Sequence, residues 1–168
     1  MTETASKTEI FLARLAVALV IAFIVLGAIW YGVSAEVRGR VWQDLMDRPF
    51  GPMMFRFILQ PIMAAIAALH DGVKDARAGS SPYFWAILTN RGERSARLRE
   101  GFISTARVII LGLVMDVTYQ LIVLHTFYPG EAAIVALLLA FVPYLLLRGL
   151  FFRLASWRSR ETSTRQTR

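Results

Sequence analysis

Apolar residues in this chain are gathered into long uncharged blocks instead of being spread at amphipathic spacing. The clearest block, Leu15–Val33, contains no charged residue. Its length is close to the ~20 residues that a helix needs to cross about 30 Å of hydrocarbon. The chain has 168 residues and is 56% hydrophobic, whereas soluble domains hold roughly 45–50% apolar residues. The sequence therefore predicts an all-α, polytopic membrane protein.

The blocks predict one transmembrane helical domain over residues 1–152, a small bundle of four transmembrane helices. The expected spans cover about residues 12–33, 53–70, 105–127 and 132–152. The second block is the weakest because Arg56, Gln60 and Pro61 interrupt it. A three-span chain, in which this block is re-entrant or interfacial, is the alternative. We expect Arg56 to reach the interface by snorkelling.

Three polar segments surround these blocks. Ala35–Phe50 alternates apolar and charged residues at helical spacing, which predicts an amphipathic helix lying in the interface. The stretch Val33-Ser34-Ala35 resembles a signal-peptide cleavage site, so a cleaved first block is an alternative. Residues 71–103 form the expected polar loop, with Tyr83, Phe84 and Trp85 as an interfacial anchor. The basic tail, 153–168, is expected to be disordered.

The orientation follows from the distribution of basic residues. The chain carries 19 Lys and Arg against 12 Asp and Glu. The loop and the tail are both basic, whereas the short link Phe127–Glu131 has no Lys or Arg. Because basic segments stay on the cytoplasmic side, we expect the loop and both termini in the cytoplasm. The predicted location is a cytoplasmic (inner) membrane, and the Arg-, Ala- and Leu-rich composition suggests a bacterial protein.

The basic residues of the loop and tail indicate which partners to expect. They flank apolar blocks, so anionic lipid headgroups explain them first, with an acidic protein partner as the alternative. No basic module interleaved with aromatic residues is present, so we expect no nucleic-acid binding. The residues expected at lipid or at a partner are Arg91, Arg94, Arg97, Arg99, Arg153, Arg158 and Arg160.

One acid, Asp116, lies at the centre of the third block. An ionisable group inside a membrane is costly and is by default a functional-site hypothesis. If the second and third spans pack antiparallel, Asp116 lies level with Gln60, and Gln120 lies near Arg56. The predicted intramembrane polar cluster is therefore Asp116, Gln120, Gln60, Arg56 and Tyr119. Hydrogen bonding between helices is its simplest role, and a proton or ion path is the alternative.

Other chemistry finds little support in the sequence. There is no cysteine, no phosphate-binding glycine loop and no zinc-protease motif. His70 and His125 fall at opposite ends of the predicted bundle, roughly 30 Å apart, so they cannot share one haem. His70 with Asp71 and Asp75 is a common helix-end arrangement and a weak metal candidate. We expect no metal, no cofactor and no enzymatic activity.

These observations favour a small integral membrane protein that acts as a non-catalytic accessory or assembly subunit of a membrane complex, with possible self-association. A small channel or transporter with a polar path around Asp116 is the second hypothesis. A membrane enzyme that holds an anionic substrate on its basic loop is the third.

Overall fold

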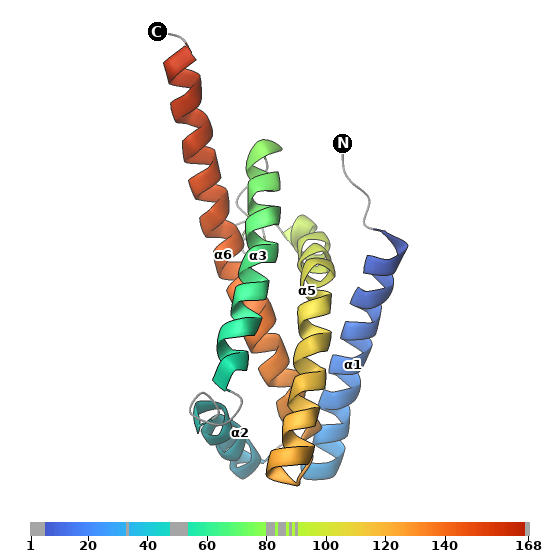
Figure 1. Ribbon diagram of the computed structural model, residues 1–168. Coiled ribbons are helices and arrows are strands. Elements are labelled where there is room, and N and C mark those ends of the chain that lie inside the picture. Colours follow the sequence, from blue (N-terminus) through green and yellow to red (C-terminus); the bar gives the residue numbers. More distant parts are fainter. Residues whose placement is uncertain are drawn as a thin grey trace.

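The computed structural model describes residues 6–32, 34–47, 54–79, 83, 87, 89 and 91–166, and no strand occurs among them. Its elements are α1 (Lys7–Tyr31), α2 (Ala35–Asp47), α3 (Met54–Arg77), α5 (Arg91–Tyr119), the π-helical turn η2 (Gln120–Leu124) and α6 (Pro129–Gln166). Four of the helices, α1, α3, α5 and α6, run alongside one another, and α2 lies at one end of this bundle (Figure 1). The prediction of an all-α fold is confirmed for the described residues.

Three helical segments are long and apolar enough to cross a membrane. They are Lys7–Tyr31, Arg94–Leu124 and Pro129–Trp157. They correspond to the first, third and fourth predicted spans. The two termini, the end of α3 and the start of α5 lie at the same end of the bundle, opposite α2 (Figure 1).

Local interactions set both ends of α1. The Ser6 hydroxyl accepts a hydrogen bond from the Glu9 amide at 3.3 Å, and the Glu9 carboxylate accepts one from the Ser6 amide at 3.0 Å. This capping box satisfies amide groups that have no partner within the first turn. The helix ends at Gly32, whose φ of 73° favours glycine. The Tyr31 hydroxyl then donates to the Phe127 carbonyl at 2.8 Å, which ties this end of α1 to the α5–α6 turn.

The backbones of α1 and α6 approach closely at Gly27 and Gly130. A Cβ atom added at Gly27 would lie 2.7 Å from the Gly130 nitrogen. We therefore expect Gly27→Ala to destabilise the protein by about 1–3 kcal/mol, the usual cost of overpacking. Thermal denaturation in mild detergent measures this loss.

The matched control is Gly39→Ala in α2, where an added Cβ meets nothing within 4 Å. Alanine favours a helix interior over glycine by about 1 kcal/mol. We expect this variant to keep or raise the denaturation midpoint. Equal midpoints for the two variants would show that the Gly27 contact contributes nothing to stability.

Helix α3 has a polar buried side and an apolar exposed side. Its buried residues recur about every four positions and are Arg56, Gln60, Ala64, Ala68, Gly72 and Asp75. Its exposed large apolar residues are Met54, Phe55, Ile58, Leu59, Ile62, Ile66 and Leu69. The buried side packs mainly against α6. A helix on the surface of a water-soluble protein has the opposite arrangement, with its apolar side buried and its polar side exposed.

The helices extend further into the polar segments than the sequence predicts. Helix α3 continues to Arg77 and α5 begins at Arg91, so the connection is shorter than the expected loop 71–103. Helix α6 continues to Gln166, into the segment 153–168 for which the sequence predicts a disordered tail. The tail contains no glycine or proline to end a helix.

Helix α2 occupies most of the range predicted as an amphipathic helix, 35–50, and residues 48–50 lie outside the described part of the chain. The Ser34 hydroxyl caps this helix by accepting from the Val37 amide at 3.2 Å. Trp42 and Met46 are exposed. Val33, the first residue of the cleavage-like stretch, also lies outside the described residues.

Candidate functional site

Arg56 of α3 and Asp116 of α5 form an ion pair in the interior. Arg56 is 2% exposed and Asp116 is fully buried. Arg56 Nη1 donates to Asp116 Oδ1, and Arg56 Nε donates to Gln60 Oε1 at 2.8 Å. Gln60 Nε2 in turn donates to the Val108 carbonyl at 3.2 Å. The two charges therefore neutralise each other across the α3–α5 contact.

Gln120 connects this pair to the turn between α5 and α6. Its Nε2 donates to Asp116 Oδ2 at 2.7 Å, and its Oε1 accepts from the Tyr128 amide at 2.6 Å. Gln120 also begins the π-helical turn η2, in which each backbone hydrogen bond joins residues five apart instead of four. The turn ends at His125, which adopts a left-handed conformation with φ of 51°. We call Arg56, Gln60, Asp116 and Gln120 the inner polar cluster.

The structure brings these four predicted residues together. Relative to the predicted packing, however, α3 is shifted along α5 by about one helical turn. Arg56, and not Gln60, contacts Asp116, while Gln60 lies near Val108. The expectation that Arg56 reaches the interface is wrong, because the Asp116 carboxylate gives the guanidinium a partner in the interior. Tyr119, the fifth predicted member, is buried on the adjacent turn of α5.

A second buried polar cluster surrounds Arg148 of α6, which is fully buried. Arg148 Nε donates to Asp75 Oδ2 at 2.8 Å, and Nη2 donates to Glu100 Oε1 at 2.7 Å. Nη1 donates to the Tyr144 hydroxyl, which donates onward to Asp71 Oδ2 at 2.7 Å. This Arg148 cluster joins α3, α5 and α6 through one guanidinium.

Tyr83, from the connection between α3 and α5, covers the Arg148 cluster. Its ring lies 4.0 Å from the Arg148 guanidinium carbon, a cation–π distance. Burial raises the pKa of Tyr83 to about 12, and the positive charge of Arg148 opposes this rise. The phenol therefore stays protonated at neutral pH and donates to the Arg97 carbonyl. The prediction of Tyr83 as an interfacial anchor is wrong, while Phe84 and Trp85 lie outside the described residues.

The arginines predicted at lipid or at a partner differ in their environments. Arg91, Arg94, Arg99 and Arg153 are exposed. Arg97 instead points inward, with its Nη1 3.5 Å from Glu100 and 3.8 Å from Asp75, because the Arg148 cluster contains more acids than bases. The side chains of Arg158 and Arg160 lie outside the described part of the chain.

Sequence reasoning missed the Arg148 cluster because its acids and its base were assigned to different segments. The sequence predicts a loop that contains Asp71 and Asp75, and an apolar span that contains Arg148 near its end. One signal was available. Asp71 and Asp75 are four residues apart, as are Tyr144 and Arg148, so each pair shares a helix face.

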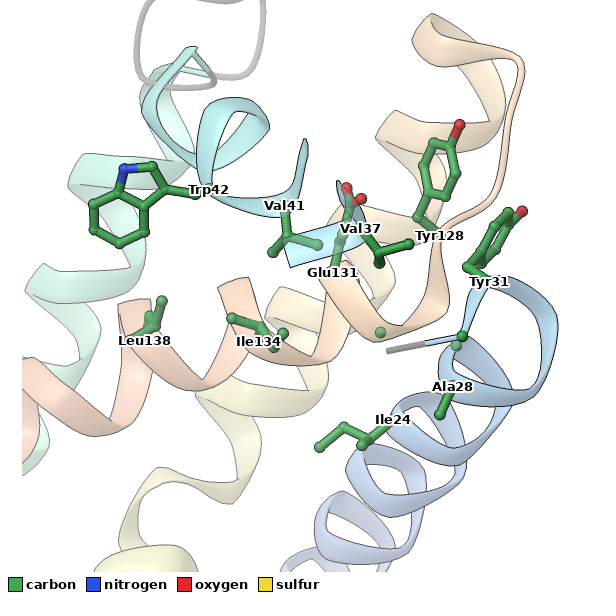
Figure 2. A pocket seen from close by; sticks show the side chains of 13 residues that line it. Ile24, Ala28, Tyr31, Val37, Val41, Trp42, Tyr128, Glu131, Ile134 and Leu138 are labelled. Carbon is green, nitrogen blue, oxygen red and sulfur yellow. The ribbon is translucent and has the colours of Figure 1, made fainter. Parts of the chain in front are cut away.

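An apolar groove of about 330 Å³ lies between the end of α1, helix α2 and the start of α6. Figure 2 shows Val37, Val41 and Trp42 of α2 on one side of it and Ile134 and Leu138 of α6 on another. The charged group among its described lining residues is Glu131, in the first turn of α6. A carboxylate there is stabilised by the helix dipole. Because the other described lining residues are aliphatic, aromatic or glycine, the groove is suited to apolar contact.

A polar cavity of about 660 Å³ lies between α1, α3 and α5. Its polar lining residues are Ser6, Glu9, His70, Asp71, Lys74, Glu100, Ser104 and Arg107. Asp71 and Glu100 also belong to the Arg148 cluster, so the cavity adjoins that cluster.

The described residues contain no group of three His, Asp or Glu side chains arranged to hold a metal ion. His70, with a side chain that is 77% exposed, lies near the end of α3, whereas His125 lies at the α5–α6 turn. No protein-family model, curated protein or solved structure matches the chain. The fold is all-helical, and its three long apolar helices indicate a membrane-embedded protein.

Proposed function

We propose that this chain is a small integral membrane protein with four crossing helices and a non-catalytic role, as an accessory or assembly subunit of a membrane complex. The observation that carries the proposal is that the two buried arginines, Arg56 and Arg148, lie in ion pairs and hydrogen bonds between helices. Arg56 binds Asp116 across α3 and α5, and Arg148 binds acids of α3 and α5 from α6. Such contacts hold helices together without lining an open passage.

The fourth crossing helix in this proposal is α3. Its exposed apolar stripe suits lipid, and its polar groups face the bundle interior, as intramembrane polar groups generally do. Helix α3 has 24 residues, about 36 Å of helix, which is longer than the ~30 Å thickness of the hydrocarbon core. Its two buried charged residues, Arg56 and Asp75, both have ion-pair partners within the bundle. Counting charges alone therefore underestimates how well α3 fits a membrane.

The same proposal places α2 in the interface and both termini in the cytoplasm. Helix α2 lies at the end of the bundle opposite the termini (Figure 1). Exposed Trp42 suits the headgroup region. The end that carries the termini also carries Lys74, Arg77 and Arg91, which supports a cytoplasmic position under the positive-inside rule.

Small residues separate the two buried clusters, which argues against a continuous polar path. Ala64 and Ala68 of α3, between Arg56 and Asp75, are fully buried. At Gly72 an added Cβ would lie 2.8 Å from the Arg148 carbonyl oxygen. Such close packing leaves little room for water between the clusters.

Purification of the full chain in mild detergent, with the mass of the particle measured by light scattering, tests the proposal. We expect a defined complex heavier than one 18.9 kDa chain, containing either a second copy or a stoichiometric partner. We also expect no ion flux in liposomes under proton, sodium or potassium gradients. The double variant Arg56→Gln with Asp116→Asn removes both inner charges but keeps amide groups, and it should retain the complex.

A small channel or transporter with a polar path around Asp116 is the second candidate, and the full burial of this ionisable residue within a long apolar helix favours it. This function predicts flux in liposomes from the wild-type chain. The flux should be lost in the Arg56→Gln, Asp116→Asn variant while its elution profile stays unchanged. That result would replace the accessory role. A monomer with no partner and no flux would contradict both candidates.

A further inference from the structure

A third cavity, separate from the two buried clusters, combines an apolar groove with two cationic side chains. It measures about 650 Å³ and lies between α1 and α5. Its apolar lining includes Ile10, Ala13, Val17, Ala18, Ile21 and Phe102. Arg14 of α1 and Arg99 of α5 line the same space, and both are exposed.

We infer that this groove binds one anionic phospholipid, with the phosphate at Arg14 and Arg99 and an acyl chain along the apolar lining. The inference deepens the proposed function and rests on the membrane placement of α1 and α5. Charge complementarity selects the occupant, because two guanidinium groups favour a phosphate and the groove below them offers apolar side chains.

The direction of the helices places most of the apolar lining deeper in the bundle than the two charges, with Ile10 one turn of α1 nearer the end of the bundle than Arg14. Helices α1 and α5 run parallel, each starting at the end of the bundle that holds the termini (Figure 1). Arg99 precedes Phe102 along α5, and Arg14 precedes Val17, Ala18 and Ile21 along α1. From Arg14 to Ile21 the groove continues for about 10 Å, a length that an acyl chain can follow.

The depth of the two arginines also suits a headgroup. Arg14 lies seven residues after Lys7, the first residue of α1, and Arg99 lies eight residues after Arg91, the first residue of α5. The two positions are therefore about 10 and 12 Å along their helices from the end of the bundle at which both helices start. Guanidinium groups at this depth snorkel toward the phosphate layer. Under the proposed orientation this is the cytoplasmic leaflet, where anionic lipids supply the negative surface potential. Arg97, on the same helix as Arg99, pairs with Asp75 and Glu100 and does not line the groove.

Native mass spectrometry of the detergent-purified full chain, titrated with phosphatidylglycerol or phosphatidylcholine of equal chain length, tests the inference. We expect the wild type to bind one phosphatidylglycerol in preference to phosphatidylcholine. The double variant Arg14→Gln with Arg99→Gln should lose about 25-fold in this preference, since each near-surface cation contributes roughly fivefold. Ala18→Phe fills the groove without changing charge, and it should weaken binding of both lipids.

The matched control is Arg94→Gln with Arg153→Gln, which removes two exposed charges that do not line the groove. It should retain the preference within about twofold. An equal loss in this control would show a diffuse electrostatic effect and overturn the site. Equal binding of the two lipids by the wild type, or unchanged binding by Ala18→Phe, would also overturn it.

Two further outcomes identify a different occupant. If millimolar inorganic phosphate displaces phosphatidylglycerol as effectively as unlabelled phosphatidylglycerol does, the site binds an anion and does not bind an acyl chain. A change from dimer to monomer in Ala18→Phe, with no lipid bound to the wild type, would show that a second copy covers the groove. Each result overturns the lipid site. Whether the wild-type protein forms a complex or conducts ions is decided separately, by the purification and flux measurements, so the lipid site can fail while the proposed function stands.

Discussion

Replacing Arg148 by methionine is expected to destabilise the protein by about 3–5 kcal/mol, because it leaves the buried Asp75 carboxylate without its cation. Asp75 and Glu100 each accept a hydrogen bond from Arg148, and Asp71 is linked to it through Tyr144. Arg97 is more distant and replaces only part of the lost charge. We expect a markedly lower denaturation midpoint in mild detergent and a large fraction of aggregated chain on size-exclusion chromatography.

Two comparison variants show whether the charge and the shape of Arg148 are responsible. Arg148→Lys keeps the charge but not the planar, forked set of donors, so it should fall between the wild type and Arg148→Met. Arg153→Met, an exposed position on the same helix, should change stability by no more than about 0.5 kcal/mol. If Arg148→Met is as stable as Arg153→Met, the Arg148 cluster does not hold the three helices together.

Replacing either member of the inner ion pair alone is expected to cost about 3–5 kcal/mol, whereas replacing both should cost much less than the sum. Arg56→Met leaves the Asp116 carboxylate uncompensated in the interior, and Asp116→Leu leaves the Arg56 guanidinium uncompensated. The double variant has neither charge. A residual loss is expected, because Gln60 Oε1 no longer receives the hydrogen bond from Arg56 Nε.

A thermal double-mutant cycle in one detergent measures this coupling. As a control, Arg56→Met combined with Arg153→Met should be additive within about 0.5 kcal/mol, since the two sites share no partner. Additive losses for the Arg56 and Asp116 variants would mean that the two side chains are not an energetically coupled pair. The proposal that polar contacts hold α3 against α5 would then lose its main support.

For the inner polar cluster, helical periodicity predicts which residues meet but not the register between the two helices. Asp116 and Gln120 lie four residues apart in one apolar block, and Arg56 and Gln60 lie four apart in another. Each pair therefore shares a helix face, and burial of both faces brings the pairs together. The vertical register was not predictable, because it depends on where α3 begins after a connection that the sequence does not constrain. A shift of one turn exchanges Gln60 for Arg56 as the partner of Asp116.

The Arg148 cluster shows what periodicity does not reveal. Its acids come from the end of α3 and the start of α5, and its arginine comes from α6. Each of these residues on its own resembles a flanking charge at a membrane surface. The helices continue into the polar segments because these charges pair with one another, so an assignment based on hydropathy places the boundaries too early.

The sequence by itself determined the all-α class, the three long apolar helices and the residues of the inner polar cluster. These features depend on local composition and on spacing within one helix, which the order of residues specifies directly. Only the tertiary structure decided the register between helices, the burial of Arg56, and the convergence of Asp75, Glu100 and Arg148. These depend on which helix faces meet and at what height, and that is set by packing between segments far apart in the chain.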